Sequence, residues 1–222
     1  MTEDETIEQL IVRLSQLLGP LPRDNRQESI EIIGKLRGMD GLTGVFNREG
    51  LDLRLEEEVA RALRYNRHLS VIMVDVDYFK RYNDAYGHLQ GDEALRHIAR
   101  ILKRQRRHAD IVGRYGGEEF LSILPESTTE GTEQAAANLV RKVRDTYLND
   151  FVGMVGTDAK QYLPGRTYKN LTISAGVASL GTSKSASDLL REVDTALYSA
   201  KKHGKDRVYI FDQNTTLQFP IP

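Results

Sequence analysis

The chain has 222 residues, 40% of them hydrophobic, and its 31 Lys and Arg against 32 Asp and Glu give a formal net charge of −1. This balance argues against a general nucleic-acid-binding protein, which is usually strongly basic. The absence of cysteine excludes disulfides and zinc–thiolate sites. No apolar run approaches the roughly 20 residues that a membrane-spanning helix needs, and the acidic N-terminus does not resemble a signal peptide. We therefore expect a soluble cytoplasmic protein with one main domain, no nucleic-acid partner and no membrane association.

Residues 1–38 are predicted to form a short helical hairpin. Apolar residues recur at helical spacing from Ile7 to Leu18, a Gly-Pro-Leu-Pro segment then breaks the first helix, and the second ends near Gly38. So short a pair cannot bury its own apolar stripe. We therefore expect it either to pack on the main domain or to join two subunits.

Helices and strands alternate along the rest of the chain. The expected helices cover residues 47–67, 78–84, 93 onward, 133–148 and, with Ser187 as its cap, 187 to about 201. The expected strands cover residues 69–77, 110–115, 120–124, 171–178 and 207–211. Glycines predict a loop over residues 85–92 and an extended loop, with or without a hairpin, over residues 149–169. Residues after 211 are expected to be an appended tail.

The strand over residues 69–77 is apolar until it ends in acids. Side chains alternate across a strand, so Asp75 and Asp77 should share one face. This pattern is typical of a buried central strand that delivers carboxylates to a site at the sheet edge. For Asp77 we favour capping of the helix that Tyr78 opens. Asp75 lies too early to cap, and there we favour metal binding.

The segment behind these acids has groups that suit a nucleotide. A helix N-terminus has free N–H groups for phosphate, and Lys80 adds positive charge, although an isolated lysine is commonly a solvated surface residue. Asn83 and Asp92 offer an amide and a carboxylate, which suit the hydrogen-bonding edge of a purine. Each of these two residues is also common as a loop cap.

A tight β-hairpin is predicted around Gly116 and Gly117. Glycine at both turn positions supplies conformations that bulkier residues avoid, and it lets a ligand approach the backbone. Glu118 and Glu119 follow directly. Adjacent carboxylates at a hairpin tip indicate metal or phosphate handling, with a plain polar turn as the alternative.

Basic residues recur on one helix face at Arg96, Arg100, Lys103 and Arg107. Such a stripe is either the solvated side of the helix or an anion site that continues towards Asp110.

Several motifs occur together in a fixed order: an Asp-Val-Asp-Tyr-Phe-Lys segment at Asp75, Asn83 with Asp92, and Arg-Tyr-Gly-Gly-Glu-Glu-Phe from Arg114. With Asp-Gly-Leu-Thr at Asp40 and further matches up to residue 211, they closely resemble the GGDEF family of diguanylate cyclases. The resemblance predicts a catalytic domain over residues 39–213, between the helical segment 1–38 and a tail, 214–222.

The resemblance implies an α+β fold, an α/β sandwich of the palm-like nucleotidyl-cyclase type, with a central, mostly antiparallel sheet wrapped by helices. It also implies conversion of two GTP into cyclic di-GMP and two pyrophosphates. Each domain would hold one GTP, so a homodimer would bring two domains face to face.

The family's metal and catalytic roles map onto matching positions. Asp75 and Glu118, with the backbone carbonyl of Val76, would bind Mg²⁺ or Mn²⁺, two ions per GTP site. Glu119 would be a further metal ligand or the general base, and Lys80 would assist catalysis.

Substrate contacts map in the same way. The phosphates would meet Phe79, Lys80, Lys201 and Lys205, and the guanine edge would meet Asn83 and Asp92. Some relatives that make mixed cyclic GMP-AMP have serine at the position of Asp92, so aspartate favours the all-guanine product. Lys205 and Asp206 replace the usual Arg-Asn, and lysine lacks arginine's bidentate fork.

Arg107 and Asp110 match the family's R-x-x-D inhibitory site, where the product binds as an intercalated dimer. Arg141 or Arg144 could complete that site, but Leu139 or Asn138 occupies the expected position of the second arginine, which predicts weaker inhibition.

Two alternatives to an active diguanylate cyclase are a non-catalytic module that senses GTP or cyclic di-GMP, and a mixed cyclic GMP-AMP synthase.

Overall fold

The computed structural model describes residues 38–155, 171–181, 185–212 and 215–221, with side chains given outside 147–155. The strands are β1 Leu69–Val76, β2 Ile111–Arg114, β3 Glu119–Pro125, β4 Ile173–Ser179, β5 Val208–Asp212 and β6 Thr215–Phe219. The helices are α3 Arg48–Tyr65, α4 Phe79–Tyr86, α5 His88–Gln105, α6 Thr129–Val155 and α8 Ala186–Lys202.

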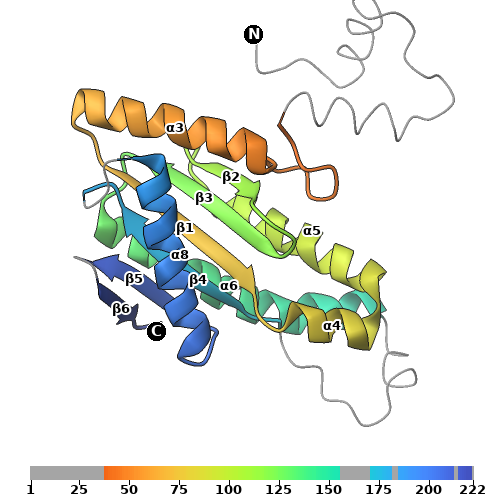
Figure 1. Cartoon of the computed structure of the whole chain (residues 1–222). Helices are drawn as coiled ribbons and strands as arrows, with labels where there is room; N and C mark the ends of the chain where they lie inside the picture. The colour runs from red at the N-terminus through yellow and green to blue at the C-terminus, as the bar shows by residue number, and fades with distance from the viewer. Residues whose placement is uncertain (1–37, 156–170, 182–184, 213–214, 222) are drawn as a thin grey trace, which may run out of the picture.

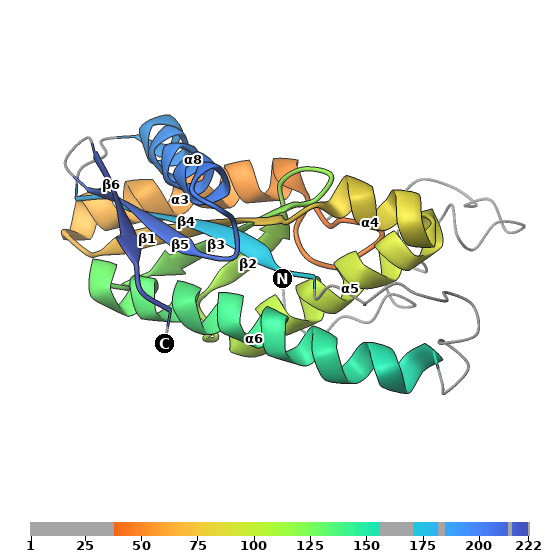
Figure 2. The ribbon, with the colours of Figure 1, turned by 90° about the horizontal axis from the view of Figure 1, so that it is seen from below.

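The strands form one sheet in the order β2-β3-β1-β4-β5-β6, in which only β4 and β5 run parallel. Helices α3 and α8 cover one face of the sheet, and α5 and α6 cover the other (Figures 1 and 2). This is the predicted α+β fold, a mostly antiparallel sheet wrapped by helices.

Strand β1 is the centre of the molecule. All eight of its residues are buried, because it pairs with both β3 and β4 and is covered on both faces. Val71 and Met73 pack in the cluster with α3 and α8, whereas Ile72 and Val74 pack in the cluster with α5 and α6. A strand buried on both faces favours apolar residues on both sides, which explains the uninterrupted apolar run from Val71 to Val74.

Polar side chains fix where two of the helices begin. Asn47 precedes α3 and accepts a hydrogen bond from the Gly50 N–H at 2.9 Å. Ser185 does the same for α8, accepting from the Asp188 N–H at 3.1 Å. The prediction that Ser187 caps α8 was wrong, because the helix already contains Ser187 and its side chain is exposed.

The loop predicted over residues 85–92 is mostly helical. Only Gly87, with φ 86°, separates α4 from α5, so Gly91 and Asp92 belong to α5. Gly91 is buried because a helical glycine allows α5 to approach α4 closely, and this need for contact outweighs its weak helix propensity.

The last part of the chain also differs from the prediction. Helix α6 continues to Val155, so residues 149–155 are helical rather than extended. The presumed tail contains β6, which pairs antiparallel with β5 and brings Phe219 against the main apolar cluster. The predicted helices of residues 1–37 and the remainder of the predicted loop, residues 156–170, lie outside the described residues. Among the helices that are described, none is long and apolar enough to cross a membrane.

Gly176 in β4 gives a test of the packing between sheet and helix. A Cβ atom there would lie 2.4 Å from the Val193 carbonyl oxygen and 2.5 Å from the Leu197 nitrogen, both backbone atoms of α8. Because backbone cannot rotate away, we expect Gly176→Ala to lower the free energy of unfolding by about 1–3 kcal/mol. Urea denaturation measures this, with Gly181→Ala as the control, since its Cβ would meet nothing within 4 Å. Equal midpoints for the two variants would contradict this packing.

Candidate active site

Acidic side chains from two distant segments meet at the C-terminal end of β1. Asp75 pairs in register with Glu119 at the start of β3. One residue further, the Val76 N–H donates to the Glu118 carbonyl oxygen at 3.2 Å. The pairing of β1 with β3 therefore fixes the hairpin acids beside the strand acid, as the sequence predicted.

A lysine from α8 lies among these carboxylates. The Lys201 Nζ atom is 2.7 Å from Asp75 Oδ2 and 4.0 Å from Glu119 Oε1. The Asp75 side chain is only 6% exposed, so its charge has little contact with water. The ammonium group of Lys201 thus balances part of a buried negative charge.

The surroundings of the acids disfavour their ionised forms. Burial raises the pKa of Asp75 above its ordinary value, although Lys201 opposes this shift. Burial likewise raises the pKa of Glu118, and the nearby charge of Asp75 raises it further. A second cation at this place would relieve both effects.

The donor set is suited to Mg²⁺. Carboxylates of Asp75 and Glu118 and the carbonyl oxygen of Val76 are hard oxygen ligands, and Mg²⁺ is usually held by one or two carboxylates together with substrate phosphates. The described residues contain no ready cluster of three or more His, Cys, Asp or Glu side chains for a metal. These residues would therefore fit a metal that arrives with a phosphate-bearing ligand.

Asp77 does not cap α4, although the sequence predicted that it would. Its carboxylate accepts hydrogen bonds from the Thr172 and Ser174 hydroxyls, at 2.7 and 2.6 Å, and from the Asp206 N–H at 3.0 Å. The residue at the cap position of α4 is Tyr78, which has φ 57° and makes no side-chain capping bond. Two hydroxyls near the start of β4 donate to the Asp77 carboxylate. Asp77 therefore joins the end of β1 to β4 and to the turn after α8.

The beginning of α4 is left open for a ligand. Without a side-chain cap, the N–H groups of its first turn retain the capacity to bind an anion. The side chain of Phe79 is buried, so only its backbone could contact phosphate, whereas Lys80 is exposed. Lys205 also approaches this end, since its Nζ atom lies 4.5 Å from the centre of the Tyr78 ring.

Asn83 and Asp92 lie on α4 and α5, close to the junction of the two helices. The buried Oδ1 atom of Asn83 has no hydrogen-bond partner in the described structure. Gly91 faces this atom so closely that a Cβ there would lie 1.9 Å from it. A buried acceptor without a donor is uncommon in proteins and indicates a place that a ligand can complete.

The two hairpin glycines act differently from the prediction. Neither Gly116 nor Gly117 is among the glycines with positive φ, so the expected unusual backbone conformation was wrong. Gly116 instead leaves room for the Glu119 carboxylate, since a Cβ would come within 2.6 Å of Glu119 Oε2 and would require that side chain to move. A Cβ on Gly117 would meet nothing within 4 Å, so that side of the tip is open to a ligand.

Comparison with known proteins agrees with this geometry. The profile of the family described as diguanylate cyclase, GGDEF domain, matches residues 37–207. The chain belongs to the GGDEF family. Diguanylate cyclase DgcP of Pseudomonas aeruginosa is 36% identical over 171 residues, 77% of this chain and 23% of DgcP. Diguanylate cyclase DosC of Escherichia coli K12 is 35% identical over 174 residues, 78% of this chain and 35% of DosC. The chain thus spans about a quarter to a third of these relatives.

Solved GGDEF domains have the same fold. The GGDEF domain of DgcB from Caulobacter crescentus, crystallised in complex with c-di-GMP, has a TM-score of 0.69 and 27% identity, covering 78% of this chain and 95% of that one. The active GGEEF domain of a diguanylate cyclase from Vibrio cholerae has a TM-score of 0.63 and 31% identity, covering 75% and 97%. The palm-like architecture expected from the sequence is therefore confirmed.

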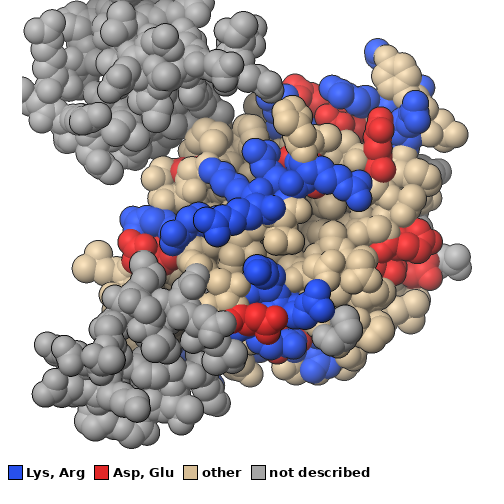
Figure 3. Space-filling model, turned by 180° about the vertical axis from the view of Figure 1, so that it is seen from behind, with Lys and Arg blue, Asp and Glu red and all other residues tan. Residues whose placement is uncertain are grey.

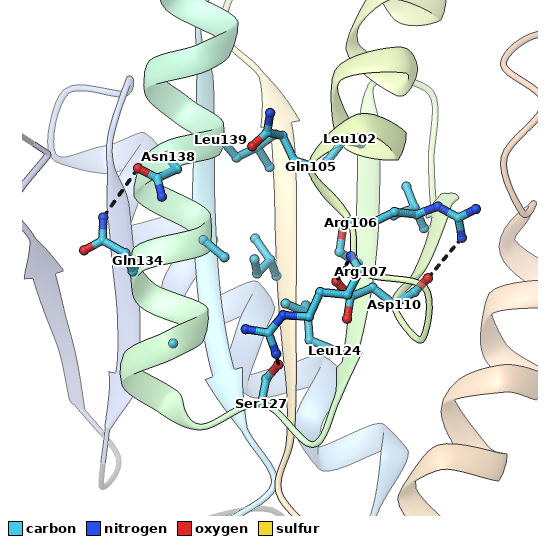
Figure 4. Close-up of a pocket in the computed structure, with 15 residues that line it drawn as sticks. Leu102, Gln105, Arg106, Arg107, Asp110, Leu124, Ser127, Gln134, Asn138 and Leu139 are labelled. Atoms are coloured by element: carbon cyan, nitrogen blue, oxygen red, sulfur yellow. Dashed lines mark hydrogen bonds between the residues drawn. The ribbon is translucent and has the colours of Figure 1, made fainter.

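Arg107 and Asp110 of this GGDEF domain lie away from the acids, at the other end of β2 from the hairpin tip. They line a pocket of about 390 Å³ between α5 and α6 (Figure 4). The Arg107 N–H donates to Asp110 Oδ2 at 2.7 Å, and its guanidinium donates to the Ser127 hydroxyl at 3.4 Å. Asp110 Oδ1 is buried and, like Asn83 Oδ1, lacks a hydrogen-bond partner in the described structure.

Neither predicted second arginine lines this pocket. Asn138 and Leu139 are there instead, as the sequence suggested. Arg141 donates to the Asn138 side chain at 3.0 Å, whereas Arg144 forms an ion pair with Asp206. The pocket therefore has the Asn138 amide where the family resemblance predicts a second arginine.

The predicted basic stripe is exposed over most of its length, but α5 ends at Gln105, so Arg107 lies beyond the helix and not on its face. Arg100, Lys103 and Arg107 are exposed, and Arg96 is half-buried and pairs with Glu93 at 2.6 Å. Lys and Arg form a continuous band on the face of the molecule opposite to that of Figure 1 (Figure 3). Since Arg107 belongs to both the stripe and the pocket, the positive potential extends to the pocket mouth.

Sequence reasoning missed the supporting role of five residues around the site. These are Tyr78, Thr172, Ser174, Arg144 and Asp206. Thr172 and Ser174 stand two residues apart on an extended segment, which could have indicated hydroxyls on one face. Nothing in the sequence indicates that Arg144 on α6 should meet a turn more than 60 residues away.

The raised pKa of Glu118 gives a prediction for stability. A carboxyl whose folded-state pKa lies above its unfolded value loses stabilisation as the pH rises through the folded value. We therefore expect Glu118→Gln, which mimics the protonated form, to raise the unfolding temperature of the metal-free protein at neutral pH and to reduce the increase caused by Mg²⁺. Thermal unfolding with and without Mg²⁺ measures both effects, with Glu56→Gln on exposed α3 as the control. An unchanged response to Mg²⁺ would remove Glu118 from the metal-binding set.

Proposed function

We propose that this chain is a diguanylate cyclase that converts two GTP into cyclic di-GMP and two pyrophosphates. The observation that carries the proposal is the meeting of Asp75, Glu118 and Glu119 beside the uncapped start of α4. Buried and half-buried acids next to free N–H groups are suited to a phosphate ligand that arrives with a divalent cation. Because GTP is the substrate, we expect the activity in the cytoplasm.

Asp75, Glu118 and the Val76 carbonyl would hold Mg²⁺ or Mn²⁺, two ions for each GTP. When bound, such ions lower the pKa of the ribose 3′-hydroxyl and neutralise charge on the leaving pyrophosphate. Lys201 now pairs with Asp75, so it would be released from that carboxylate when a metal replaces it. Its ammonium group would then be free for the phosphates.

The triphosphate would be bound by groups on both sides of the acids. Backbone N–H groups of Phe79 and Lys80 are at the open helix start. Lys80, Lys201 and Lys205 supply positive charge. Glu119, which lies next to the metal ligands, would take the proton of the attacking 3′-hydroxyl or serve as a further ligand.

The side chains at the junction of α4 and α5 would recognise guanine. The Asp92 carboxylate would accept from the N1–H and N2–H₂ groups, and the unpartnered Oδ1 of Asn83 could accept a further hydrogen bond. Adenine lacks this donor pair, and leaving such buried acceptors unpaired costs about 1–3 kcal/mol. Aspartate rather than serine at position 92 supports cyclic di-GMP over a mixed cyclic GMP-AMP.

The product requires two copies of the domain. Each chain has one set of groups for one GTP, and the product has two phosphodiester bonds, so a homodimer would place two bound nucleotides face to face. Each 3′-hydroxyl would then attack the α-phosphate of the other nucleotide.

The pocket at Arg107 and Asp110 would bind the product and inhibit the enzyme. The exposed stripe of α5 supplies positive charge for its phosphates, and the unpartnered Asp110 Oδ1 could accept from guanine. With Asn138 in place of a second arginine, we expect weaker inhibition than in relatives with two arginines. Allosteric couplings of about 1–3 kcal/mol change affinity roughly 5- to 150-fold.

A non-catalytic module that senses GTP or cyclic di-GMP is the second candidate. It is favoured by the pocket at Asp110, but it gives no role to the acids that meet at the end of β1. Tight product binding without turnover would support it.

The dimeric mechanism predicts how the rate depends on protein concentration. While monomers predominate, doubling the protein should raise the rate of cyclic di-GMP formation about fourfold, because dimer concentration follows mass action. Chromatography of reactions with GTP and Mg²⁺ measures the product, and Glu118→Gln serves as the inactive control. No cyclic di-GMP at high protein concentration would refute the proposed activity, and a mixed product from GTP with ATP would favour the alternative synthase.

Removal of the Arg107 side chain tests the inhibitory pocket. A hydrogen bond from a charged group contributes about 1.5–3 kcal/mol, so Arg107→Ala should raise the half-inhibitory concentration of cyclic di-GMP at least about tenfold. The matched control is Arg104→Ala, an exposed arginine in the last turn of α5 that is outside the pocket lining. Equal inhibition of the two variants would exclude Arg107 from product binding.

A further inference from the structure

The turn between α8 and β5 has an unusual backbone. Gly204, Lys205 and Asp206 follow one another with φ of 119°, 65° and 51°. Residues other than glycine rarely adopt such positive φ, and two in succession persist only where their surroundings hold them. Contacts with the rest of the protein must therefore hold this turn in its conformation.

Arg144 on α6 binds the turn at Asp206. Its Nε atom lies 2.9 Å from Oδ2 and 3.2 Å from Oδ1 of Asp206, and its Nη2 atom donates to the Asp206 carbonyl at 3.4 Å. One guanidinium thus binds both the side chain and the backbone of the same residue, which fixes orientation as well as distance. Both side chains are about one-third exposed.

Asp77 holds the same residue from the other side. Its carboxylate accepts from the Asp206 N–H at 3.0 Å and is itself oriented by the hydroxyls of Thr172 and Ser174. The Lys205 N–H donates to the Ala200 carbonyl at 3.0 Å, which joins the turn to the end of α8. The turn is therefore fixed to β1, α6 and α8.

These contacts determine where the Lys205 side chain goes. Its ammonium group lies 4.5 Å from the centre of the Tyr78 ring and 4.0 Å from Asp77 Oδ1, directly beside the open start of α4. Lysine has a flexible stem and binds phosphate as a point charge, without arginine's rigid fork. Because the side chain is flexible, the position of the Lys205 backbone must fix where the ammonium group lies.

We propose that Arg144 and Asp206 are a positioning pair that holds Lys205 for the triphosphate of GTP. Asp206 places a negative charge near the position proposed for the negatively charged triphosphate. Arg144 neutralises the charge of Asp206. The pair thus makes α6 a part of the substrate site. This inference rests on the proposed cyclase function and assigns Arg144 no direct contact with the nucleotide.

The electrostatic part of the proposal gives a distinctive order of effects. Arg144→Gln leaves the Asp206 carboxylate uncompensated near the triphosphate, so it should raise the KM for GTP about tenfold, as for a lost charged hydrogen bond, with kcat changed less than about twofold. Adding Asp206→Asn to that variant removes the uncompensated charge. We expect the double variant to recover most of the lost affinity, which a purely structural defect would not do.

The experiment uses the full chain and two readouts. Steady-state turnover separates KM from kcat, and calorimetry measures binding of a non-hydrolysable GTP analogue with Mg²⁺. Lys142→Gln, an exposed residue of the same helix, is the matched control. Val143→Ala, which removes buried atoms from α6, controls for lost stability and should lower the unfolding temperature without raising KM.

Two outcomes would overturn the positioning role alone. One is that the wild-type protein turns over GTP while Arg144→Gln has the same KM and the same analogue affinity as Lys142→Gln. The other is a double variant as weak as Arg144→Gln. A wild-type protein that neither binds the analogue nor turns over GTP would overturn the proposed function, and the positioning role with it.

Discussion

The pairing of β1 with β3 is the constraint on which the rest of the structure depends. Its register puts Asp75 opposite Glu119, so like charges are held together where a buried strand ends. Burial of these acids opposes their ionised forms and raises the pKa values of Asp75 and Glu118, and the neighbouring like charges raise them further. The apolar packing on both faces of β1 compensates for this unfavourable burial, and Lys201 balances part of the charge.

Groups that are incompletely satisfied gather where a nucleotide would lie. The start of α4 has no side-chain cap, and Asn83 Oδ1 has no donor. In a protein selected only for stability, such features would be filled by a capping residue and a hydrogen bond. Their surroundings are by contrast well ordered, since Asp77 accepts three hydrogen bonds beside them. Rigid support around unsatisfied groups is the arrangement expected of a preorganised binding site.

Local patterns predicted the parts of this molecule that depend on local physics. The apolar run of β1 and the existence of the hairpin at Gly116 could be predicted from the sequence, because both follow from the pattern of apolar residues, whereas the backbone conformation of the hairpin glycines could not. The role of Asp77 could not, because the hydroxyls that capture it come from Thr172 and Ser174, far along the chain. The ion pair of Arg144 with Asp206 and the addition of β6 likewise depend on tertiary contacts. Glycines misled the prediction at residues 85–92, where they permit two helices to touch instead of forming a loop.

The close contact between Gly91 and Asn83 limits how base preference can change. A Cβ on residue 91 would lie 1.9 Å from Asn83 Oδ1, so any side chain there requires the Asn83 side chain to move, and the two residues together set the spacing of α4 and α5. A chain with this junction would acquire a new nucleobase more readily by exchanging the acid at Asp92 than by remodelling the helices. Under the proposed recognition of guanine, substrate choice would then change through single polar exchanges, while the spacing of α4 and α5 stays the same.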